Sequence, residues 1–386
     1  MTWVPPSDNT YDDAPAITKR RIDKTPTNNL SDYSKGVIEM ETYLPDAATR
    51  GEFERMARND GVGERSEFWR SLPLLPERPS ISHKGTFGVA LAVGGSRGMT
   101  GAISLTGSAT LAAGAGLTRL VTPNTVLDVV AQYEREYTTI PGPCDDAGRF
   151  KFEAKDGILE LSEHSTAVAI GPGLGRSDEL EWLVTELFFE LQTPVVIDAD
   201  ALNAIASTGF LSSGGESQFV GRRPKGPRVF TPHPGEFYRL AGYAPTSDPE
   251  ARLVEAKEWL ESYATLFPNC EATLLLKGPG TVIASIVPEE EELREATVNV
   301  NATGNSNLAT GGSGDVLTGV ILGLLAQGAT CDEAARSGAA LHGIAAELRS
   351  AICSRGAVAS DVVRFIPCAF DYYETAQAHA RNMRED

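Results

Sequence analysis

Short apolar segments, each ending in a glycine-rich or acidic turn and followed by a helix, recur along most of this chain. Val89–Val93 is an unbroken apolar run, and the glycine-rich turn Gly94–Ala102 follows it before a stretch of small residues that predicts a helix through Ala115. An apolar run without polar alternation is typical of a strand buried on both faces. The repeated units predict an α/β fold with three layers, in which a central, mostly parallel sheet is flanked by helices.

Further units of this kind follow along the chain. We expect strands over residues 117–121, 166–170, 194–197, 228–231, 273–277, 282–286 and 297–300. We expect helices over residues 178–191, 313–327, 332–350 and 365–381, and one more behind residue 236. In such folds, ligands bind in the crevice at the carboxyl ends of the strands, so the turns that follow the strands are the candidate sites. No linker divides residues 76–386, which are therefore expected to form one domain.

The N-terminal part, residues 1–75, differs from that domain in composition. It is polar and broken by Pro, Asn and Asp, and only residues 48–57 and 64–70 have a mildly helical pattern. This composition predicts an extension that is partly disordered or packed loosely on the body. We expect it to add no catalytic group, so a chain that begins near Leu75 is expected to keep most of its activity.

Composition also excludes several classes of partner. A formal net charge of −18 argues against nucleic acid, which is bound by clusters of lysine and arginine. The five cysteines are odd in number and form no Cys-x-x-Cys pair, so neither a disulfide framework nor a zinc site is indicated. No apolar run reaches about 18 residues, and the N-terminus lacks a signal pattern. We expect a soluble, cytoplasmic protein with no membrane partner.

Residues 301–328 combine a glycine-rich loop with an apolar helix. Four glycines lie among small polar residues in the first half, and the helical pattern begins at about Ser313. A loop of this kind that enters a helix presents free backbone N–H groups and the positive end of the helix dipole. That arrangement binds anions, so the sequence predicts a phosphate site here.

Asp315 lies in the first turn of the same predicted helix. Aspartate is ordinary there as a cap or a partner of the helix dipole. An acid beside a phosphate loop repels phosphate, however, so a further reason for its presence is needed. A general base that accepts the proton of a hydroxyl attacking a phosphoryl group is such a reason. We favour this role and keep capping as the alternative.

Four other turns each have a structural and a functional interpretation. Gly171-Pro-Gly-Leu-Gly175 is either a tight turn or main chain that a ligand approaches closely. His233, fixed between two prolines, is either a structural hydrogen-bonding group or a substrate contact. Lys277-Gly-Pro-Gly-Thr281 is either a β-turn or a hairpin that reaches a nucleotide, although it is not a Walker loop. Asp198 and Asp200 are cap and turn formers, or hold Mg²⁺ through water.

Together these motifs resemble the NAD(P)H-hydrate dehydratase family, which has a ribokinase-like fold. The resemblance covers about residues 76–380, and its motifs lie in residues 83–102, 171–175, 198–203, 231–236, 277–281 and 301–328. It implies an enzyme that repairs hydrated NADH or NADPH with ADP or ATP and Mg²⁺. In that reaction the hydroxyl at C6 of the nicotinamide ring is phosphorylated, phosphate leaves and the ring double bond is restored.

The resemblance also implies roles for individual residues. It makes Asp315 the catalytic aspartate at the substrate hydroxyl. The implied substrate-binding residues are Ala102, Gly173, His233 and Asp315. The implied nucleotide-binding residues are Lys277, Gly278, Pro279, Gly280, Thr281, Asn305, Gly311, Gly312, Ser313 and Gly314. Residues 305–308 replace the Thr-Pro-Gly type of turn that is usual in the family.

The family resemblance has two further implications. It implies a homo-oligomer, and specifically a tetramer. Bifunctional members carry an epimerase domain that residues 1–75 do not resemble, so we expect no epimerase activity. The residues leave open the metal ligands and the choices between ADP and ATP and between hydrated NADH and hydrated NADPH.

Two other functions are alternatives. A ribokinase-like kinase of a small alcohol or vitamin precursor would share the loop and Asp315, but the Pro-His-Pro setting of His233 and the loop Gly171–Gly175 favour the dehydratase. A non-enzymatic nucleotide-binding sensor would need the loop but no acid at position 315.

Overall fold

The structure, a computed structural model, describes residues 47–211, 219, 221–288 and 295–382. These residues fall in one compact unit that spans residues 45–386, and the disorder expected within residues 1–46 lies outside the described residues. The described sheet has nine strands: β1 (Val89–Val93), β2 (Leu117–Pro123), β3 (Thr138–Gly142), β4 (Ala167–Ile170), β5 (Val195–Ile197), β6 (Arg228–Phe230), β7 (Ala272–Leu276), β8 (Val282–Ile286) and β9 (Thr297–Val300).

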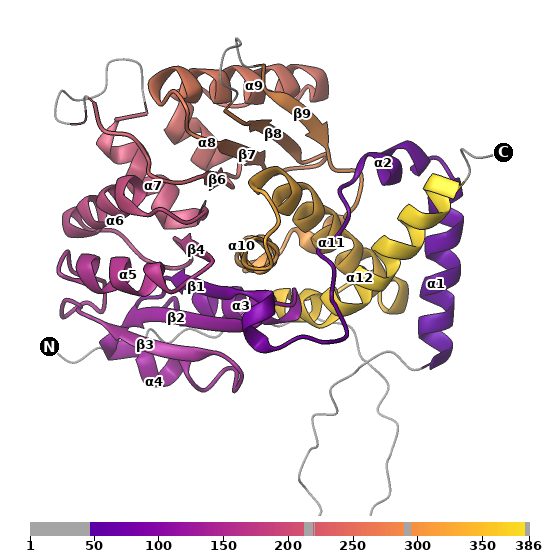
Figure 1. Cartoon of the computed structure of the whole chain (residues 1–386), viewed down its shortest axis with the longest axis horizontal. Coiled ribbons are helices and arrows are strands. Elements are labelled where there is room, and N and C mark those ends of the chain that lie inside the picture. The colour runs from indigo at the N-terminus through magenta and orange to yellow at the C-terminus, as the bar shows by residue number, and fades with distance from the viewer. Residues whose placement is uncertain (1–46, 212–218, 220, 289–294, 383–386) are drawn as a thin grey trace, which may run out of the picture. The chain divides into compact units, whose positions relative to one another are not determined.

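The strands lie in the order β3-β2-β1-β4-β5-β6-β7-β8-β9 (Figure 1). Pairing is parallel from β3 to β7, whereas β8 is antiparallel to both β7 and β9. The strand order reverses between β1 and β4, which is where α/β sheets of this type open a crevice for ligands. The glycine-rich turns after these two strands meet there, because Gly95 N donates a hydrogen bond to Pro172 O at 2.8 Å.

Two layers of helices cover the two faces of the sheet, and β1 shows why. Its Ala90 and Ala92 belong to one core cluster, whereas Leu91 and Val93 belong to the other. On the alanine face lie α3 (Thr100–Ala112), α10 (Ser313–Ala326), α11 (Cys331–Ile352) and α12 (Ala359–Asn382). On the other lie α5 (Ala154–Glu163), α6 (Asp178–Glu190), α7 (Ala199–Thr208), α8 (Pro234–Ala241) and α9 (Pro249–Leu266). The alternation of side chains along this strand therefore directs its small residues into one core and its large residues into the other.

Helices α3 and α10 pack unusually closely, and glycines make this contact possible. A Cβ atom at Gly319 would lie 2.3 Å from the main-chain oxygen of Thr106, and one at Gly323 would lie 2.7 Å from the Cβ atom of Ala113. The hydroxyl of Thr106 also donates a hydrogen bond to the main-chain oxygen of Asp315 at 3.1 Å. Helix α3 therefore fixes the position of the first turn of α10.

The predicted α/β class with a mostly parallel sheet is confirmed. Strands β1, β8 and β9 begin and end where the sequence predicts, and the other predicted strands differ by one or two residues at an end. Strand β3 was not predicted because it lies at the edge of the sheet, where a half-exposed segment with a proline lacks an apolar run. The structure adds α4 (Leu127–Val130), α5, α7 and a second helix, α9, after α8.

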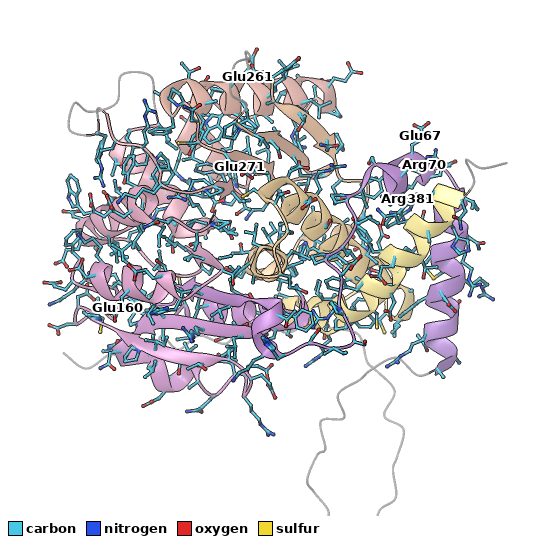
Figure 2. All side chains as sticks on the ribbon, viewed as in Figure 1. Glu67, Arg70, Glu160, Glu261, Glu271 and Arg381 are labelled. Atoms are coloured by element: carbon cyan, nitrogen blue, oxygen red, sulfur yellow. The ribbon has the colours of Figure 1, made fainter. Side chains whose placement is uncertain are left out.

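Residues 47–72 form part of this unit, so the boundary expected at residue 75 falls inside it. Helices α1 (Ala47–Val62) and α2 (Ser66–Ser71) pack on α12, and Trp69 is fully buried in the same core cluster as α10. Arg70 donates a hydrogen bond to Ala380 O at 3.2 Å, and Arg381 donates one to Leu72 O at 3.3 Å. Figure 2 labels both arginines, Arg70 on α2 and Arg381 on α12. A chain that begins near Leu75 would expose this part of the core, so we expect it to be destabilised rather than to keep its activity.

Among the described helices, none is both long and apolar enough to cross a lipid bilayer. The five cysteines, all within the described residues, are free thiols.

Candidate active site

Asp198 directly follows β5, and its carboxylate lies at the centre of the site with only 1% of the side chain exposed. Its Oδ1 accepts hydrogen bonds from Thr231 Oγ1 at 2.8 Å and from Lys277 Nζ at 2.7 Å. Its Oδ2 accepts one from Thr318 Oγ1, in the second turn of α10, at 2.7 Å. A buried carboxylate is stable only when it is paired and hydrogen-bonded. Asp198 therefore ties together the ends of β5, β6 and β7 and the start of α10, and it forms no side-chain cap on α7.

Lys277 places its ammonium group between Asp198 and the first turn of α10. A Cβ atom at Gly314 would lie only 3.2 Å from Lys277 Nζ, so glycine at this position allows the close approach. Burial by itself would lower the pKa of Lys277, but the negative charges of Asp198 and Glu236 outweigh it and raise that pKa. Lys277 is thus a fixed positive charge beside the predicted phosphate loop, directed into the centre of the site rather than along the hairpin that follows it.

Asp315 lies next to this ion pair, in the first turn of α10. Burial, and after it the negative charge of Asp198, raises the pKa of Asp315 to about 7. A carboxyl group that titrates near neutral pH is suited to accept a proton from a hydroxyl. The N-cap residue of α10 is Gly312, and no side-chain cap forms at this end of the helix. The geometry therefore favours the general-base interpretation of Asp315 over the capping interpretation.

The second half of the loop supplies the anion site. Gly311 is exposed, and Gly312 adopts a φ of +87°, a left-handed conformation that favours glycine. Ser313 Oγ lies 3.3 Å from His342 Nε2, and burial lowers the pKa of His342 to about 4, so this imidazole is neutral. The first N–H groups of a helix have no acceptor within the helix. Ser313 N donates to Thr310 O at 3.3 Å, but no acceptor is described for the amides of Gly312 and Gly314. The α10 N-terminus therefore presents these two amides beside Lys277, as the sequence predicts for a phosphate site.

The first half of the loop is instead held by α11. Gly304 N donates a hydrogen bond to Glu347 Oε1 at 2.9 Å. Asn305 Nδ2 donates to Ala346 O at 3.3 Å and to Ser350 Oγ at 2.9 Å, and the short 3₁₀ helix η5 (Ser306–Leu308) begins after it. The side-chain amide of Asn305, a predicted nucleotide contact, is therefore engaged by α11. Any contact of Asn305 with a nucleotide is therefore expected to come from its main chain.

Arg65, which the sequence reading did not single out, supports the same half of the loop. Its Nη1 donates hydrogen bonds to Ala302 O at 3.1 Å and to Glu347 Oε1 at 3.0 Å, and its Nη2 donates to Asp60 Oδ2 at 2.6 Å. Arg65 lies between α1 and α2, so the N-terminal helices contact the nucleotide loop directly. No local pattern marks this residue, because its partners lie up to 282 positions away in the sequence.

The hairpin after β7 is fixed by Arg252, another residue that sequence reasoning missed. Arg252 of α9 is buried, and it donates hydrogen bonds to Pro279 O at 3.0 Å and Leu276 O at 3.3 Å. A Cβ atom at Gly278 would lie 2.9 Å from its Nη2. Thr281 Oγ1 donates to Gly278 O at 3.0 Å, closing a β-turn whose tip, Pro279 and Gly280, is exposed. The hairpin also adjoins the loop, because the main-chain N–H of residue 301 donates to the oxygen of residue 281 at 2.9 Å.

On the opposite side of Asp198, the structure brings together two predicted substrate-binding residues. Gly173 has a φ of +66°, and a Cβ atom there would lie 3.1 Å from the Cβ atom of Ala102. Gly171 is required for a different reason, because a Cβ atom there would lie 1.8 Å from Asp198 O. Gly175 N donates a hydrogen bond to Asp200 Oδ2 at 2.9 Å. At least two of these three glycines are therefore explained by contacts between main-chain segments of the protein itself.

His233, also a predicted substrate contact, is the N-cap residue of α8. Its Nδ1 accepts hydrogen bonds from Gly235 N at 2.9 Å and Glu236 N at 3.3 Å, which confirms the structural interpretation of this histidine. Burial and the charge of Lys277 lower the pKa of His233, so it is neutral at pH 7 with the ring proton on Nε2. Burial also raises the pKa of Glu236 to about 7. Half of the His233 side chain is exposed, which leaves the ring accessible to a substrate.

Within the described residues, no group of three or more histidine, cysteine, aspartate and glutamate side chains is placed to hold a metal ion. The carboxylate of Asp198 is already occupied by three hydrogen-bond donors, which argues against the alternative that it holds Mg²⁺. Asp200 keeps one oxygen on Gly175 N and receives a long contact of 3.5 Å from Asn203 Nδ2 on the other.

Comparisons with a family model and with known proteins indicate the same family. The sequence model of the NAD(P)H-hydrate dehydratase family matches residues 90–367. A bifunctional NAD(P)H-hydrate repair enzyme, Nnr, from Moorella thermoacetica is 41% identical over 294 residues, which are 76% of this chain and 51% of that protein. The ADP-dependent (S)-NAD(P)H-hydrate dehydratase of Bacillus subtilis is 33% identical over 274 residues, 71% of this chain and 85% of that one. The chain thus spans about half the length of the bifunctional relatives that it matches.

Solved structures agree with this comparison. The ADP/ATP-dependent NAD(P)H-hydrate dehydratase of Bacillus subtilis, co-crystallised with ATP and Mg²⁺, has a TM-score of 0.61 at 30% identity, covering 80% of this chain and 96% of that one. A ribokinase-like superfamily protein from Enterococcus faecalis has a TM-score of 0.59 at 24% identity over 80% of this chain and 94% of its own, which shows a shared fold. Residues 47–72, and Arg65 with them, precede the range that the family model matches.

Proposed function

The chain belongs to the NAD(P)H-hydrate dehydratase family, and from that premise we propose that it restores NADH or NADPH from their hydrated forms while consuming ADP or ATP. The observation that supports this most is the grouping of Asp315, Lys277 and the free amides of the α10 N-terminus around the buried carboxylate of Asp198. A proton acceptor and a phosphate site lie side by side there, which is what phosphorylation of a hydroxyl requires.

In this proposal the nucleotide lies along the hairpin of residues 277–281 and the loop of residues 301–314. The amides of Gly312 and Gly314 and the ammonium of Lys277 contact the phosphoryl group that is transferred, where their positive charge stabilises the transition state. Mg²⁺ would accompany the nucleotide, shield the charge of its phosphates and take most of its ligands from phosphate and water. The hydrated nicotinamide would lie against Ala102, Gly173 and His233.

Two chemical steps follow from this arrangement. First, the C6 hydroxyl attacks the terminal phosphorus, so that a new O–P bond forms, the bond from phosphorus to the leaving nucleotide breaks, and Asp315 accepts the hydroxyl proton. Second, the C6–O bond breaks, phosphate leaves with the bonding electrons, and a proton is lost from the neighbouring ring carbon to restore the double bond. With ADP the products are AMP, inorganic phosphate and the reduced dinucleotide.

An absorbance assay tests the proposal directly. Hydrated NADH or hydrated NADPH is mixed with the protein, Mg²⁺ and either ADP or ATP, and the absorbance of the reduced nicotinamide is followed. We expect recovery only when a nucleotide is present. The same reactions determine the choice of nucleotide and of hydrate. Phosphorylation of small alcohols without recovery would indicate the kinase, and nucleotide binding without any turnover would indicate the sensor.

Two finer expectations stay predictions. A cytoplasmic location is expected from the sequence patterns alone, and a tetrameric assembly is implied by the family resemblance alone. Light scattering on the full chain measures the assembly, and a monomer would contradict it.

A further inference from the structure

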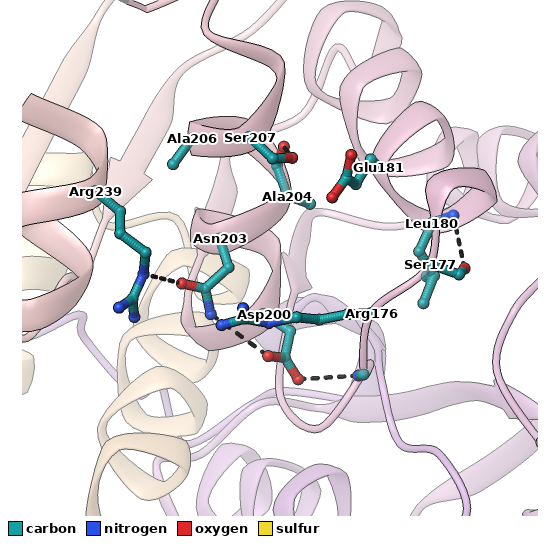
Figure 3. Close-up of a pocket in the computed structure, with 11 residues that line it drawn as sticks. Arg176, Ser177, Leu180, Glu181, Asp200, Asn203, Ala204, Ala206, Ser207 and Arg239 are labelled. Carbon is teal, nitrogen blue, oxygen red and sulfur yellow. Dashed lines mark hydrogen bonds between the residues drawn. The ribbon is translucent and has the colours of Figure 1, made fainter. Parts of the chain in front are cut away.

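A pocket of about 240 Å³ opens between α6, α7 and α8, outside the residues assigned so far to the reaction (Figure 3). Its polar lining includes Arg176, Asp200, Asn203 and Arg239, together with Glu181 from the first turn of α6. Leu180 and two alanines contribute apolar surface. A mixed lining with a few polar groups is typical of a small-molecule site.

The polar groups of the pocket are ordered by a chain of hydrogen bonds. Arg239 Nε donates to Asn203 Oδ1 at 2.6 Å, Asn203 Nδ2 lies 3.5 Å from Asp200 Oδ1, and Asp200 Oδ2 accepts from Gly175 N at 2.9 Å (Figure 3). Asn203 thus holds the guanidinium of Arg239 by its Nε and leaves the two terminal nitrogens of that group without a described hydrogen bond.

The side chains of Arg239 and Arg176 are exposed and form no described ion pair. Among the described residues, no carboxylate lies within salt-bridge distance of Arg239 or Arg176, although the chain has a formal net charge of −18. A guanidinium held on one side and open on the other matches the geometry of a phosphate group. Asp200 and Glu181 equal the two arginines in number, so it is the open edge of the Arg239 guanidinium, and not the net charge of the pocket, that favours an anionic ligand.

The pocket also adjoins the proposed reaction centre. Gly175 ends the loop that carries Gly173, and Arg239 is on the same short helix as His233. The charge of Asp200 contributes to the raised pKa of Asp315, and the charge of Arg239 contributes to the lowered pKa of His233. The pocket is thus on the substrate side, whereas the nucleotide loop and hairpin come from other elements: α10, β7 and β8.

We propose that this pocket binds the adenosine monophosphate half of the hydrated dinucleotide, with Arg239 and Arg176 contacting its phosphate. The inference rests on the proposed function, because it requires the hydrated nicotinamide ring to lie at Asp315. The rest of a dinucleotide then has to extend away from the nucleotide loop, and the pocket offers it guanidinium groups and an apolar wall for the adenine ring. Glu181 and Asp200 are placed to accept hydrogen bonds from ribose hydroxyls, as acidic residues do in dinucleotide sites.

The proposal predicts a preference for the whole dinucleotide over a truncated substrate, which contacts at the reaction centre alone would not produce. Contacts to a remote part of a substrate contribute to kcat/KM, so a truncated substrate loses them. Hydrated reduced nicotinamide mononucleotide carries the same reactive ring and hydroxyl and one phosphate, but it lacks the adenosine monophosphate half. The wild-type chain is expected to favour the dinucleotide over this mononucleotide by about 10- to 100-fold, the usual worth of a charge-assisted contact.

The test compares both substrates in the wild-type chain, in Arg239→Met and in Arg223→Met. Arg223 is an exposed arginine that does not line the pocket, and its variant is the matched control. In Arg239→Met the ratio of kcat/KM for dinucleotide over mononucleotide should fall about tenfold, and the Kd for NADH, followed by its fluorescence, should rise by a similar factor. Thermal melting of each variant, and Arg239→Lys as a variant that keeps the charge, exclude a loss of folding as the cause.

Three results would overturn the inference. An unchanged ratio in Arg239→Met would remove the pocket from the substrate site. An equal loss for both substrates would mean that Arg239 acts through His233 or the reaction centre. A rise in the KM for ADP with an unchanged substrate ratio would show that the pocket belongs to the nucleotide. A wild-type chain that restores neither substrate, with any nucleotide, would instead refute the proposed function itself, and the inference would fall with it.

Discussion

The two halves of the loop that precedes α10 differ in how their polar groups are used. In residues 301–308, side chains and amides bond to α11 and to Arg65, including Gly304 N to Glu347 and Asn305 Nδ2 to Ser350. In residues 311–314, the one described side-chain contact of this kind is that of Ser313 with His342, and the N-cap glycine offers no side chain. The first half is therefore fixed by the protein, while the second half presents free amides to an anion.

This difference indicates a division of roles within one loop. A binding site is effective when its donors are oriented before the ligand arrives, because the cost of ordering them is then already met. The contacts of residues 301–308 hold the loop in place. Residues 311–315 can therefore leave amides free for a ligand while the first half of the loop keeps them in position. We expect changes in the open half to affect both phosphate binding and the chemistry, and changes in the fixed half to affect mainly nucleotide affinity.

The largest expected effect is that of Asp315→Asn. Asparagine keeps the shape of the side chain but does not accept a proton at neutral pH, so turnover should fall by about 10²- to 10⁴-fold. Nucleotide affinity should hold or rise, since a negative charge beside the phosphates is removed. Kinetics with hydrated NADH and the melting temperature measure both. Near-normal turnover would show that Asp315 is no more than a first-turn residue of α10, because asparagine serves there as well as aspartate.

The pH dependence of kcat/KM should report the protonation of Asp315. Because the pKa of Asp315 is raised to about 7, activity should fall about tenfold per unit below that pH as the base is protonated. The pKa of Glu236 is also raised to about 7, so Glu236→Gln is the control. Disappearance of the acidic limb in that variant would assign it to Glu236 instead.

The effect of pH on stability has the opposite sign. Folding raises the pKa of Asp315, so the folded state binds this proton more tightly than the unfolded chain does. The stabilisation that this binding gives is present at low pH and is lost as pH rises through about 7.

A matched pair of glycines tests the open half next. At Gly312 the φ of +87° strains any other residue, and a Cβ atom would lie 2.6 Å from Leu105 Cδ1, whereas a Cβ atom at Gly311 would meet nothing within 4 Å. Gly312→Ala should cost about 1–2 kcal/mol of stability and weaken nucleotide binding, and Gly311→Ala should change neither appreciably. Melting temperatures and nucleotide Kd values of the two variants measure this difference. Equal effects of the two substitutions would contradict the special role of Gly312.

The smallest expected effect is that of Arg65→Met, which acts on the fixed half. Loss of the bonds to Ala302 O and Glu347 should weaken nucleotide binding by about 2- to 30-fold, the range of energetic coupling through packed contacts. Turnover at saturating nucleotide should change less than KM does. Arg55→Met is the control, since Arg55 has only an exposed ion pair with Glu52 at 3.4 Å. A loss confined to turnover would contradict a positioning role for Arg65.

Much of the scaffold was predictable because its signals are local. The apolar run Val89–Val93 and the transition from glycine loop to helix at Ser313 each depend on neighbouring residues, and both lie where the sequence places them. The same holds for the position of Asp315 in the first turn of α10. The half-exposed edge strand β3 gave no such signal, because its residues neither alternate nor form an apolar run.

The amino-acid sequence by itself determined most of the strands, the helices that follow the main turns, the glycine-rich loop and an acid at its end, since each follows from short-range periodicity and backbone chemistry. Only the tertiary structure decided the partners of Asp198, which come from residues 33 to 120 positions away. It also decided that Arg65 supports a loop 237 residues further along the chain and that Trp69 belongs to the core. The physical reason is that a buried charge or ring is stabilised by whatever packing brings to it, and packing joins segments whose separation leaves no pattern in the sequence.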